Sequence, residues 1–445
     1  MNRRELLRLG MGATAAAVLG GCTEFGGKDI QVVAVWSDRE LELFREVVDG
    51  YERVSGRSVE VIGGNDNLDA FIRGRLGAGH PPDLAVLPYP GLAVDYARAG
   101  IIDPIRDHVA ERFDPFWTDL VTVDGRVYGA WLKAAHKSLL WYQPSVPVPE
   151  PDASGRRAWT WEDLVGLVQR LADDGDPAPL AVGAADGWVL TDWLENLLIA
   201  RAPDLYDDLA RGEACWGAEP VRRAFGDLAQ LWSIPGAFPG GGERALLTQF
   251  DESVIQVAAT GDAAMSILSD FALPVADDFR PPGEPRQRIA GVPFPADALA
   301  GGPSGDDAPL LVGGDVAVVL NGSQAGHELV AWLTDGAAPF RPWMLAGGYL
   351  SPNRTACDGV EPDGCAANYA AEMAFAAEDF HRSAERLQFD LSDRLPGAFG
   401  APGGSWRILQ DFFRDVTTAG ADLDQAIDRA IGRFDQAAGN ARCST

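Results

Sequence analysis

Short apolar strands alternate with amphipathic helices in the first part of the chain, and this alternation constrains the fold more than any other feature. Residues 30–36 form an apolar run that predicts a buried strand, and residues 59–62 and 84–87 predict two further strands. Residues 40–51 carry apolar side chains at helical spacing, and residues 93–99 predict a helix that ends at Gly100. Strands and helices that alternate in this way form βαβ units around a mainly parallel sheet. The sequence therefore predicts the α/β class.

Local signals predict several further elements. Residues 123–128 predict a hairpin with an Asp-Gly turn, and residues 132–142 a long extended run. Residues 37–40 have the S-x-x-E form of a capping box, and residues 160–163 indicate the start of another helix. Residues 310–320 predict a late strand.

The first residues predict an export signal rather than a folded element. Charged residues at 3–8 precede an apolar run at 9–19, which is too short to span a bilayer and suits a cleavable signal. The run Leu19-Gly20-Gly21-Cys22 resembles the lipobox of bacterial lipoproteins, in which the cysteine is acylated. We expect a signal peptide at 1–21 and a lipidated tether at 22–29, with Cys22 carrying the lipid. The paired arginines resemble a twin-arginine signal, so the export route, Sec or twin-arginine, stays open.

The net charge of the chain limits the classes of molecule that it can bind. The formal net charge is −28, which argues against nucleic acid and anionic lipid as partners and favours a neutral or cationic ligand. The chain is 47% hydrophobic and 23% charged, as is typical of globular proteins.

The cysteines predict a disulfide rather than a metal site. Cys357 and Cys365 enclose a short loop and are the natural pair in an exported protein, whereas a second bridge between Cys215 and Cys443 stays open. The chain has no CxxC, and its five histidines are scattered, so we expect no metal and no cofactor.

The order of the motifs resembles one family over residues 30–434: the extracellular solute-binding proteins of ABC sugar importers, related to maltose-binding protein. One departure is Trp131, which stands where the family usually has proline. The segments that carry the resemblance are Trp36, Pro82-Asp83-Leu84, Ala99-Gly100-Ile101-Ile102, Asp124-Gly125-Arg126-Val127-Tyr128-Gly129, Thr160-Trp161-Glu162, Gly261-Asp262-Ala263-Ala264-Met265, Gly313-Gly314-Asp315 and Gly347-Gly348-Tyr349-Leu350-Ser351-Pro352-Asn353.

The resemblance implies a two-lobed periplasmic-binding-protein-like fold of type II, with a ligand cleft between lobes joined by hinge strands. Lobe 1 would comprise residues 30–136 and 314–348, and lobe 2 residues 137–313 and 349–445. The implied function is capture of a carbohydrate without chemistry, followed by delivery to ABC permease subunits. The protein would be a monomer on the extracellular face of the membrane, held there by its N-terminal lipid.

Sugars present apolar faces and rims of hydroxyls, so a sugar site needs aromatic rings beside polar side chains. Trp36 ends the first strand at its carboxyl end, where open α/β sheets bind ligands. The other candidates come from polar or aromatic residues in segments that the resemblance places near the cleft. The predicted ligand-binding residues are Trp36, Asp66, His136, Lys137, Trp188, Asp192, Trp193, Asp270, Asp315, Gly348, Tyr349 and Trp406.

Three alternatives remain open from the sequence. The same fold could bind a glycerophosphodiester, a peptide or a cation, although a phosphate-bearing ligand would want an arginine cluster or helix N-termini. A lipid-anchored glycoside hydrolase would need two carboxylates facing one bond, which an acidic chain can always offer. G-x-S-x-G, HExxH, GxGxxG and P-loop motifs are absent, which argues against other enzyme classes. A sensor lipoprotein without a permease is the third alternative.

Overall fold

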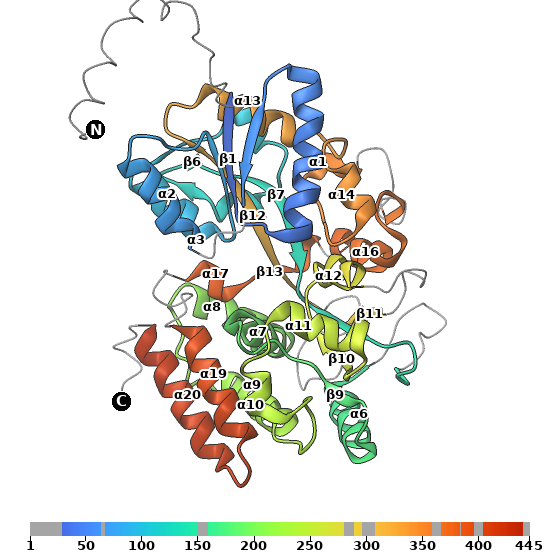
Figure 1. Ribbon diagram of the computed structural model, residues 1–445. Helices are drawn as coiled ribbons and strands as arrows, with labels where there is room; N and C mark the ends of the chain where they lie inside the picture. The colour runs from blue at the N-terminus through green and yellow to red at the C-terminus, as the bar shows by residue number, and fades with distance from the viewer. Residues whose placement is uncertain are drawn as a thin grey trace, which may run out of the picture.

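The computed structural model describes residues 29–63, 67–148, 159–279, 289–295, 308–357, 366–382, 384–395 and 404–438. Figure 1 shows two lobes, each built around a β-sheet. Lobe 1 is here the part built on the larger sheet, and lobe 2 the part built on the smaller one. The predicted signal peptide, Cys22, Asp66, Cys365 and Cys443 lie outside the described residues, as does the side chain of Cys357. Cys215 is disulfide-bonded.

The larger sheet has the strand order β13-β12-β3-β1-β2, and β4 and β7 also pair with β12. Strand β1 pairs in parallel with β2 and β3, whereas β12 runs antiparallel to β3 and β7. The predicted parallel core and the strand at 310–320 are therefore confirmed. The strands are β1 (Ile30–Ala34), β2 (Val59–Ile62), β3 (Leu84–Leu87), β4 (Ile102–Asp103), β7 (Ala130–His136), β12 (Leu310–Leu320) and β13 (Leu387–Phe389).

Helices cover the larger sheet because each has an apolar face. Helix α1 buries Leu43, Phe44, Val47, Val48 and Tyr51 and ends at Gly56 in the left-handed region. The predicted capping box at its start is wrong, because the carboxylate of Glu40 pairs with Lys133 instead of the helix N-terminus. The main helices of lobe 1 are α1 (Asp38–Ser55), α2 (Leu68–Gly77), α3 (Pro90–Arg98), α13 (Gln324–Leu333) and α14 (Arg341–Ala346), with the short α4 (Asp107–Ala110) and α5 (Pro115–Asp119).

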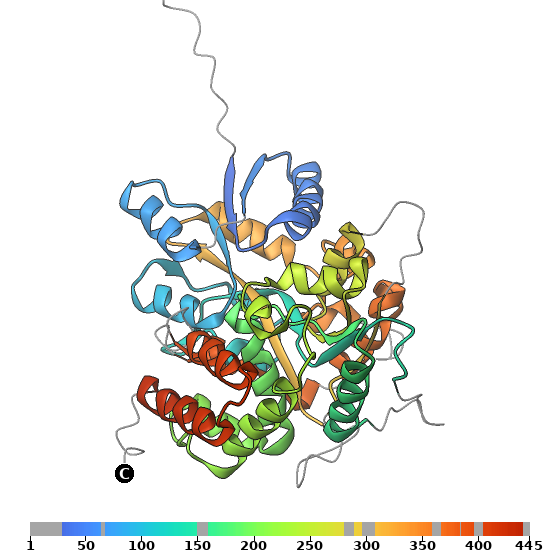
Figure 2. The same cartoon turned by 60° about the horizontal axis from the view of Figure 1, so that its bottom comes forward.

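The smaller sheet has the order β11-β8-β10-β9 and is surrounded by helices, among which the C-terminal pair α19 and α20 lie side by side (Figure 2). The helix start predicted at residues 160–163 is confirmed, and the structure shows a capping box there, since Thr160 and Asp163 exchange hydrogen bonds. The strands are β8 (Leu139–Tyr142), β9 (Ala178–Leu180), β10 (Ala263–Ile267) and β11 (Ala290–Pro293). The helices are α6 (Trp161–Asp174), α7 (Gly187–Arg201), α8 (Pro203–Ala210), α9 (Glu219–Trp232), α10 (Gly241–Ala245), α11 (Phe250–Ile255), α12 (Ala272–Asp278), α19 (Ser405–Thr417) and α20 (Leu423–Ala437).

Two further segments complete the described chain. The predicted Asp-Gly hairpin is confirmed as β5 (Thr122–Val123) and β6 (Arg126–Val127), with both turn residues at positive φ. Between α14 and α19 lie α16 (Ala374–Arg382), which precedes β13, and α17 (Leu391–Arg394), which follows it. Helix α17 contacts α3 of lobe 1 as well as α7 and α8 of lobe 2.

Along the described residues, the chain changes from one sheet or lobe to the other three times. The predicted extended run at 132–142 divides into β7 in the larger sheet and β8 in the smaller one. The other two passages lead from β11 to β12 and from β13 through α17 toward α19. The start of β12 is hydrogen-bonded to the chain on both sides. Lys137 N, after β7, donates to Leu311 O at 2.9 Å, and Asp390 N, after β13, donates to Val312 O at 2.8 Å. Residues beside these passages are thus positioned by both lobes.

Candidate functional site

Lys133 is the centre of a buried charged group on the lobe 1 side of the junction. It lies on β7 opposite Asp315 of β12, because the two residues are register partners. Its Nζ forms an ion pair with Glu40 from the first turn of α1. The indole Nε1 of Trp36 donates a hydrogen bond of 2.8 Å to Asp315 Oδ2. Lys133 is only 2% exposed, whereas its partners Glu40 and Asp315 are partly exposed.

The titration of this group follows from its burial. Burial raises the pKa of Asp315 to about 7, although Lys133 acts in the opposite direction. Burial alone would lower the pKa of Lys133, but Glu40, Asp315 and Asp270 outweigh it and raise the pKa. The lysine therefore stays charged at neutral pH, and carboxylates outnumber ammonium groups. Such a group can accept hydrogen bonds from hydroxyls.

Aromatic rings from both lobes surround the ammonium group of Lys133. Its Nζ lies 4.9 Å from the ring centroid of Phe271 and 5.6 Å from that of Trp343. Phe271 precedes α12 in lobe 2, whereas Trp343 belongs to α14 in lobe 1. Trp343 also meets Trp36 edge to face at 5.0 Å between centroids. The cation thus contacts rings of the two lobes at once.

The rings continue into lobe 2. Trp188, in the first turn of α7, lies 5.2 Å from Phe250 and 5.9 Å from Phe271, and Phe250 lies 5.1 Å from Phe271. Aromatic faces of this kind stack on the apolar faces of sugar rings. The rings that lie at the junction are named the aromatic row: Trp36, Trp343, Phe271, Phe250 and Trp188.

Asp270 is fully buried beside the aromatic row. Its Oδ1 accepts a 2.8 Å hydrogen bond from the backbone N of His136, whereas its Oδ2 has no partner among the described residues. Burial raises its pKa to about 6, and Lys133 opposes that shift. His136 itself is buried, with Nε2 3.1 Å from Asp379 Oδ2. A buried carboxylate oxygen without a protein donor is one that a ligand donor could satisfy.

Gly348 marks a close approach of the two lobes. It has φ +67°, and a Cβ added there would lie 2.4 Å from Cγ of Pro274 on α12. Gly347 before it, at φ +100°, packs against Leu273 in the same way. Glycine is therefore required where α12 of lobe 2 docks on lobe 1.

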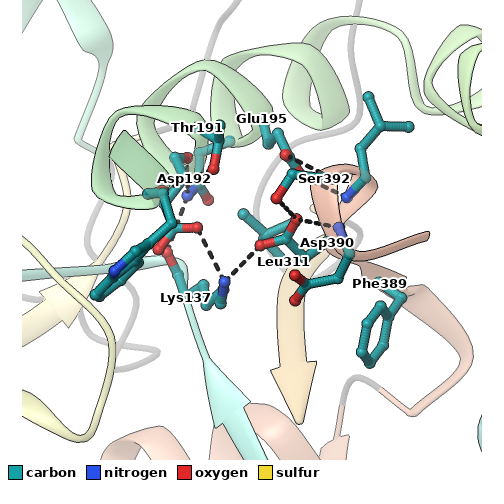
Figure 3. Close-up of polar contacts among 12 residues, drawn as sticks. Lys137, Thr191, Asp192, Glu195, Leu311, Phe389, Asp390 and Ser392 are labelled. Atoms are coloured by element: carbon teal, nitrogen blue, oxygen red, sulfur yellow. Dashed lines mark hydrogen bonds and ion pairs between the residues drawn. The ribbon is translucent and has the colours of Figure 1, made fainter. Parts of the chain in front are cut away.

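Lys137 lies at the passage from β7 to β8 and is paired with two carboxylates (Figure 3). Its Nζ is 3.1 Å from Asp192 Oδ1 on α7 and 2.5 Å from Asp390 Oδ2 after β13. Burial raises the pKa of Asp192 to about 7 against the opposing effect of Lys137. Burial lowers the pKa of Lys137, but both carboxylates outweigh it and hold the pKa well above its usual value.

Another buried carboxylate, Glu195, lies one turn further along α7 than Asp192. Its Oε2 accepts hydrogen bonds from Tyr206 Oη at 2.5 Å and from Leu391 N at 2.7 Å, and Ser392 N donates to Oε1 at 3.3 Å. Burial raises its pKa well above the usual value. This network ties α7 and α8 to the passage after β13.

The remaining predicted residues do not belong to these charged groups. Trp193 is fully buried in lobe 2, where it packs on Trp232 of α9 at 6.0 Å. Tyr349 is buried in lobe 1, with its hydroxyl donating to Leu132 O at 2.7 Å. Trp406 starts α19 and lies against Gly187, the residue before Trp188. The structure therefore brings together Trp36, Asp315, Asp270, His136, Lys137, Asp192 and Trp188. Tyr349 packs behind Trp343 of the aromatic row, at 5.4 Å between ring centroids, and Trp193 lies apart.

Sequence reasoning missed several members of this junction. Lys133 carried a signal, since the chain has only three lysines and two of them are Lys133 and Lys137. Glu40 was interpreted as part of a capping box. The other missed residues are aromatic and carried no motif: Phe250, Phe271 and Trp343.

Comparison with known proteins decides the family. The family model described as bacterial extracellular solute-binding protein matches residues 37–338, more than half of the chain. The chain belongs to this family of extracellular solute-binding proteins. Members act with ABC importers, so the implied partners are a small-molecule ligand and permease subunits.

Relatives in the family share most of their length with this chain. It is 29% identical over 411 residues to the osmoprotective compounds-binding protein GgtB of Synechocystis, covering 90% of this chain and 91% of the relative. It is 25% identical over 420 residues to the alpha-glucosides-binding periplasmic protein AglE of Rhizobium meliloti, covering 91% and 87%. The Thermus thermophilus maltotriose-binding protein, solved with maltotriose, is similar in fold, with a TM-score of 0.64, 16% identity and coverage of 92% and 99%. The predicted two-lobed fold class is thereby confirmed.

Proposed function

We propose that this solute-binding protein captures a carbohydrate or a related polyol between its lobes and delivers it to an ABC permease without a chemical step. The observation that carries the proposal is the aromatic row, which runs from lobe 1 to lobe 2 beside buried carboxylates. Rings can stack on the apolar faces of a sugar while carboxylates accept hydrogen bonds from its hydroxyls. The ligand-binding residues that we propose are Trp36, Glu40, Lys133, Trp188, Phe271, Asp270, Asp315 and Trp343.

The charges at the junction favour an uncharged ligand rather than a phosphodiester. Lys133 is paired with Glu40, and Lys137 with Asp192 and Asp390, so both lysines are neutralised by the protein. An anion would have to approach these carboxylates without a free cation to compensate. A neutral polyol meets no such penalty because its hydroxyls donate to the carboxylates.

The relatives indicate which compounds to test first. One is named for osmoprotective compounds and another for alpha-glucosides. Both classes include small, neutral, hydroxyl-rich molecules, in agreement with the row and its carboxylates. Both relatives are named as binding proteins, which supports a role without catalysis.

The test is a thermal-shift screen of residues 23–445 against mono-, di- and oligosaccharides, glucosides, polyols and glycerophosphodiesters. A ligand at one hundred times its dissociation constant stabilises the native state by about 2.7 kcal/mol, a rise of several degrees in Tm. Trp188→Ala should abolish the shift, whereas Phe279→Ala should preserve it, because Phe279 is an exposed ring at the end of α12. A shift only with a phosphodiester or a peptide would contradict the carbohydrate assignment.

A turnover assay addresses the hydrolase alternative. The compound that gives the shift is incubated with the protein, and reducing ends are measured. Release of sugar that disappears in Asp270→Asn would contradict the proposal, since a binding protein returns its ligand unchanged.

The membrane attachment is a separate proposal that rests on the sequence. We propose that Cys22 is acylated after removal of residues 1–21 and that Cys357 and Cys365 are bonded. Mass spectrometry of the membrane fraction before and after Cys22→Ser tests the first point, and non-reducing peptide mapping tests the second. We propose that the lobes hinge near Lys137, at the start of β12 and at Asp390.

A further inference from the structure

Lys137 lies where the passages between the lobes come together. Its ammonium group is 3.1 Å from Asp192 on α7 and 2.5 Å from Asp390 after β13, as Figure 3 shows. The third passage borders the same side chain, since a Cβ on Gly313 of β12 would lie 2.8 Å from Lys137 Cε. One side chain therefore lies against α7 of lobe 2, the first half of β12 and Asp390 after β13.

The same ammonium group also contacts the aromatic row. Its Nζ lies 5.7 Å from the ring centroid of Trp188. Trp188 and Asp192 are four residues apart on α7, which places them on one face of the helix. Lys137 thus meets two successive turns of α7, through a ring on the first and a carboxylate on the second.

The carboxylates and the ring around Lys137 occupy the sides of its ammonium group. An ammonium group has three N–H donors. Asp192 and Asp390 accept from it, and the face of Trp188 lies on a further side. Lys137 is 8% exposed and Asp192 3% exposed. Both residues were predicted from the sequence to contact the ligand, but their surroundings are those of a buried ion triad.

We propose that Lys137, Asp192 and Asp390 are positioning residues, which hold the ring of Trp188 in place relative to the passages between the lobes and thereby set ligand affinity without contacting the ligand. The inference rests on the proposed function, because it treats Trp188 as a surface for ligand stacking. In this proposal the triad has a defined role. When the lobes move, the triad keeps α7 and Trp188 in its first turn at a fixed position relative to the chain passages between the lobes.

The charge state of the triad makes the proposal measurable. The charged groups that face Asp192 are Lys137, Asp390 and Asp393 of α17, together with Glu195 on its own helix. The pKa of Asp192 is raised by burial to about 7. Above this pH the ammonium group is shared between two carboxylates, and below it Lys137 pairs with Asp390 alone. The surroundings of Trp188 should therefore change near neutral pH.

The decisive experiment observes Trp188 without any ligand. Residues 23–445 are labelled with 5-fluorotryptophan, and the Trp188 resonance is identified by its loss in Trp188→Phe. We expect its ¹⁹F shift to titrate between pH 5.5 and 8.5 with a midpoint near 7, and to stay constant in Asp192→Asn. The resonance of Trp193, identified with Trp193→Phe, is the internal control, since this ring packs on Trp232 instead. A Trp188 resonance that does not titrate, or that titrates equally in Asp192→Asn, overturns the proposal.

A second measurement separates positioning from direct contact. With a ligand from the screen, Asp192→Asn should weaken binding by about tenfold, which corresponds to 1.4 kcal/mol. Asp227→Asn is the matched control, because it removes the partner of Arg201 at the other end of α7 and should leave affinity unchanged. Weakened binding with an unmoved Trp188 resonance would identify Asp192 as a ligand contact and overturn the inference. If no compound binds, the proposed function fails, while the ¹⁹F titration still decides whether the triad positions Trp188.

Discussion

Lys133 on β7 of lobe 1 lies with its ammonium nitrogen 4.9 Å from the ring centroid of Phe271 in lobe 2. The lysine is held from its own lobe by Glu40, so the ring of Phe271 is the contact that lobe 2 adds. A cation–π contact of this kind forms only when the two lobes are together. We therefore expect ligand affinity to depend on the contact between Lys133 and Phe271, which forms on closure of the lobes.

Replacing Phe271 by leucine should weaken ligand binding more than it weakens folding. The substitution keeps apolar volume but removes a cation–π contact worth about 0.5–2 kcal/mol. Affinity for the identified ligand, measured by titration calorimetry, should fall by up to about thirtyfold. Phe279→Leu serves as the control, because it removes an exposed ring from the same region of lobe 2. Equal ligand affinity in Phe271→Leu and the native protein would contradict a role of this contact in binding.

Removal of the charge on Lys133 should destabilise the protein. In Lys133→Met the carboxylates of Glu40, Asp315 and Asp270 lose the cation that they share. Removing one partner of a buried ion pair costs about 3–5 kcal/mol. Urea denaturation of both proteins measures the difference in unfolding free energy. The control is Arg223→Ala, which breaks a solvent-exposed pair with Glu219 on α9 and should change stability by less than about 1 kcal/mol. A similar effect for both variants would show that Lys133 is not part of a buried charged group.

Periodicity and turn chemistry predicted individual elements and the α/β class, the two-lobed arrangement came from the family resemblance, and neither predicted the contacts of the site. The strand at 310–320 is apolar except for two glycines and Asp315, and ten of its eleven residues are buried. The pairing of Glu40 with Lys133 joins residues 93 positions apart and depends on where β7 lies beside α1, which no local pattern contains. The local S-x-x-E pattern therefore predicted that Glu40 caps its own helix.

Helix α7 shows where the sequence could have been used better. Trp188 and Trp193 were both predicted as ligand contacts because they share a short motif. Five residues of α-helix correspond to about 140° of rotation, so the two rings must face different directions. The structure places one in the aromatic row and the other against Trp232. By helical periodicity alone, Trp188 and Asp192 share one face of α7, and the ring of Trp193 lies on another.

The stability of the protein should fall as the pH rises toward neutrality because of Asp315. Its pKa is about 7 in the folded state, against a usual value of 3.8, because of burial. The folded state therefore binds a proton more tightly than the unfolded state between these values. The stabilisation from protonated Asp315 is fully present below pH about 4 and is lost as the pH rises through about 7. Thermal melts from pH 4 to 8 measure this dependence in the native protein and in Asp315→Asn.

Other acidic groups also make the unfolding free energy depend on pH. The informative quantity is therefore the difference in stability between Asp315→Asn and the native protein at each pH. Asp390 and Asp411 have lowered pKa values and contribute the opposite slope, which both proteins share. We expect Asp315→Asn to gain stability relative to the native protein as the pH rises from 4 to 7. A constant difference across this range would mean that Asp315 is ionised throughout.

Gly348 should be required for closure rather than for folding. A Cβ at Gly348 would lie 2.4 Å from Cγ of Pro274, and these two residues belong to different lobes. In Gly348→Ala the lobes could relieve this clash by staying apart, at the expense of the contacts between them. Ligand affinity should then fall at least tenfold, and small-angle scattering should show a larger radius of gyration in the presence of ligand. Gly100→Ala is a matched control, because Gly100 has the same φ of +67° but no neighbour within 4 Å of an added Cβ. Both variants carry the same backbone strain of about 1 kcal/mol, so a loss of affinity confined to Gly348→Ala would come from the contact between the lobes. Equal losses in both variants would assign the effect to backbone strain and contradict a role of Gly348 in closure.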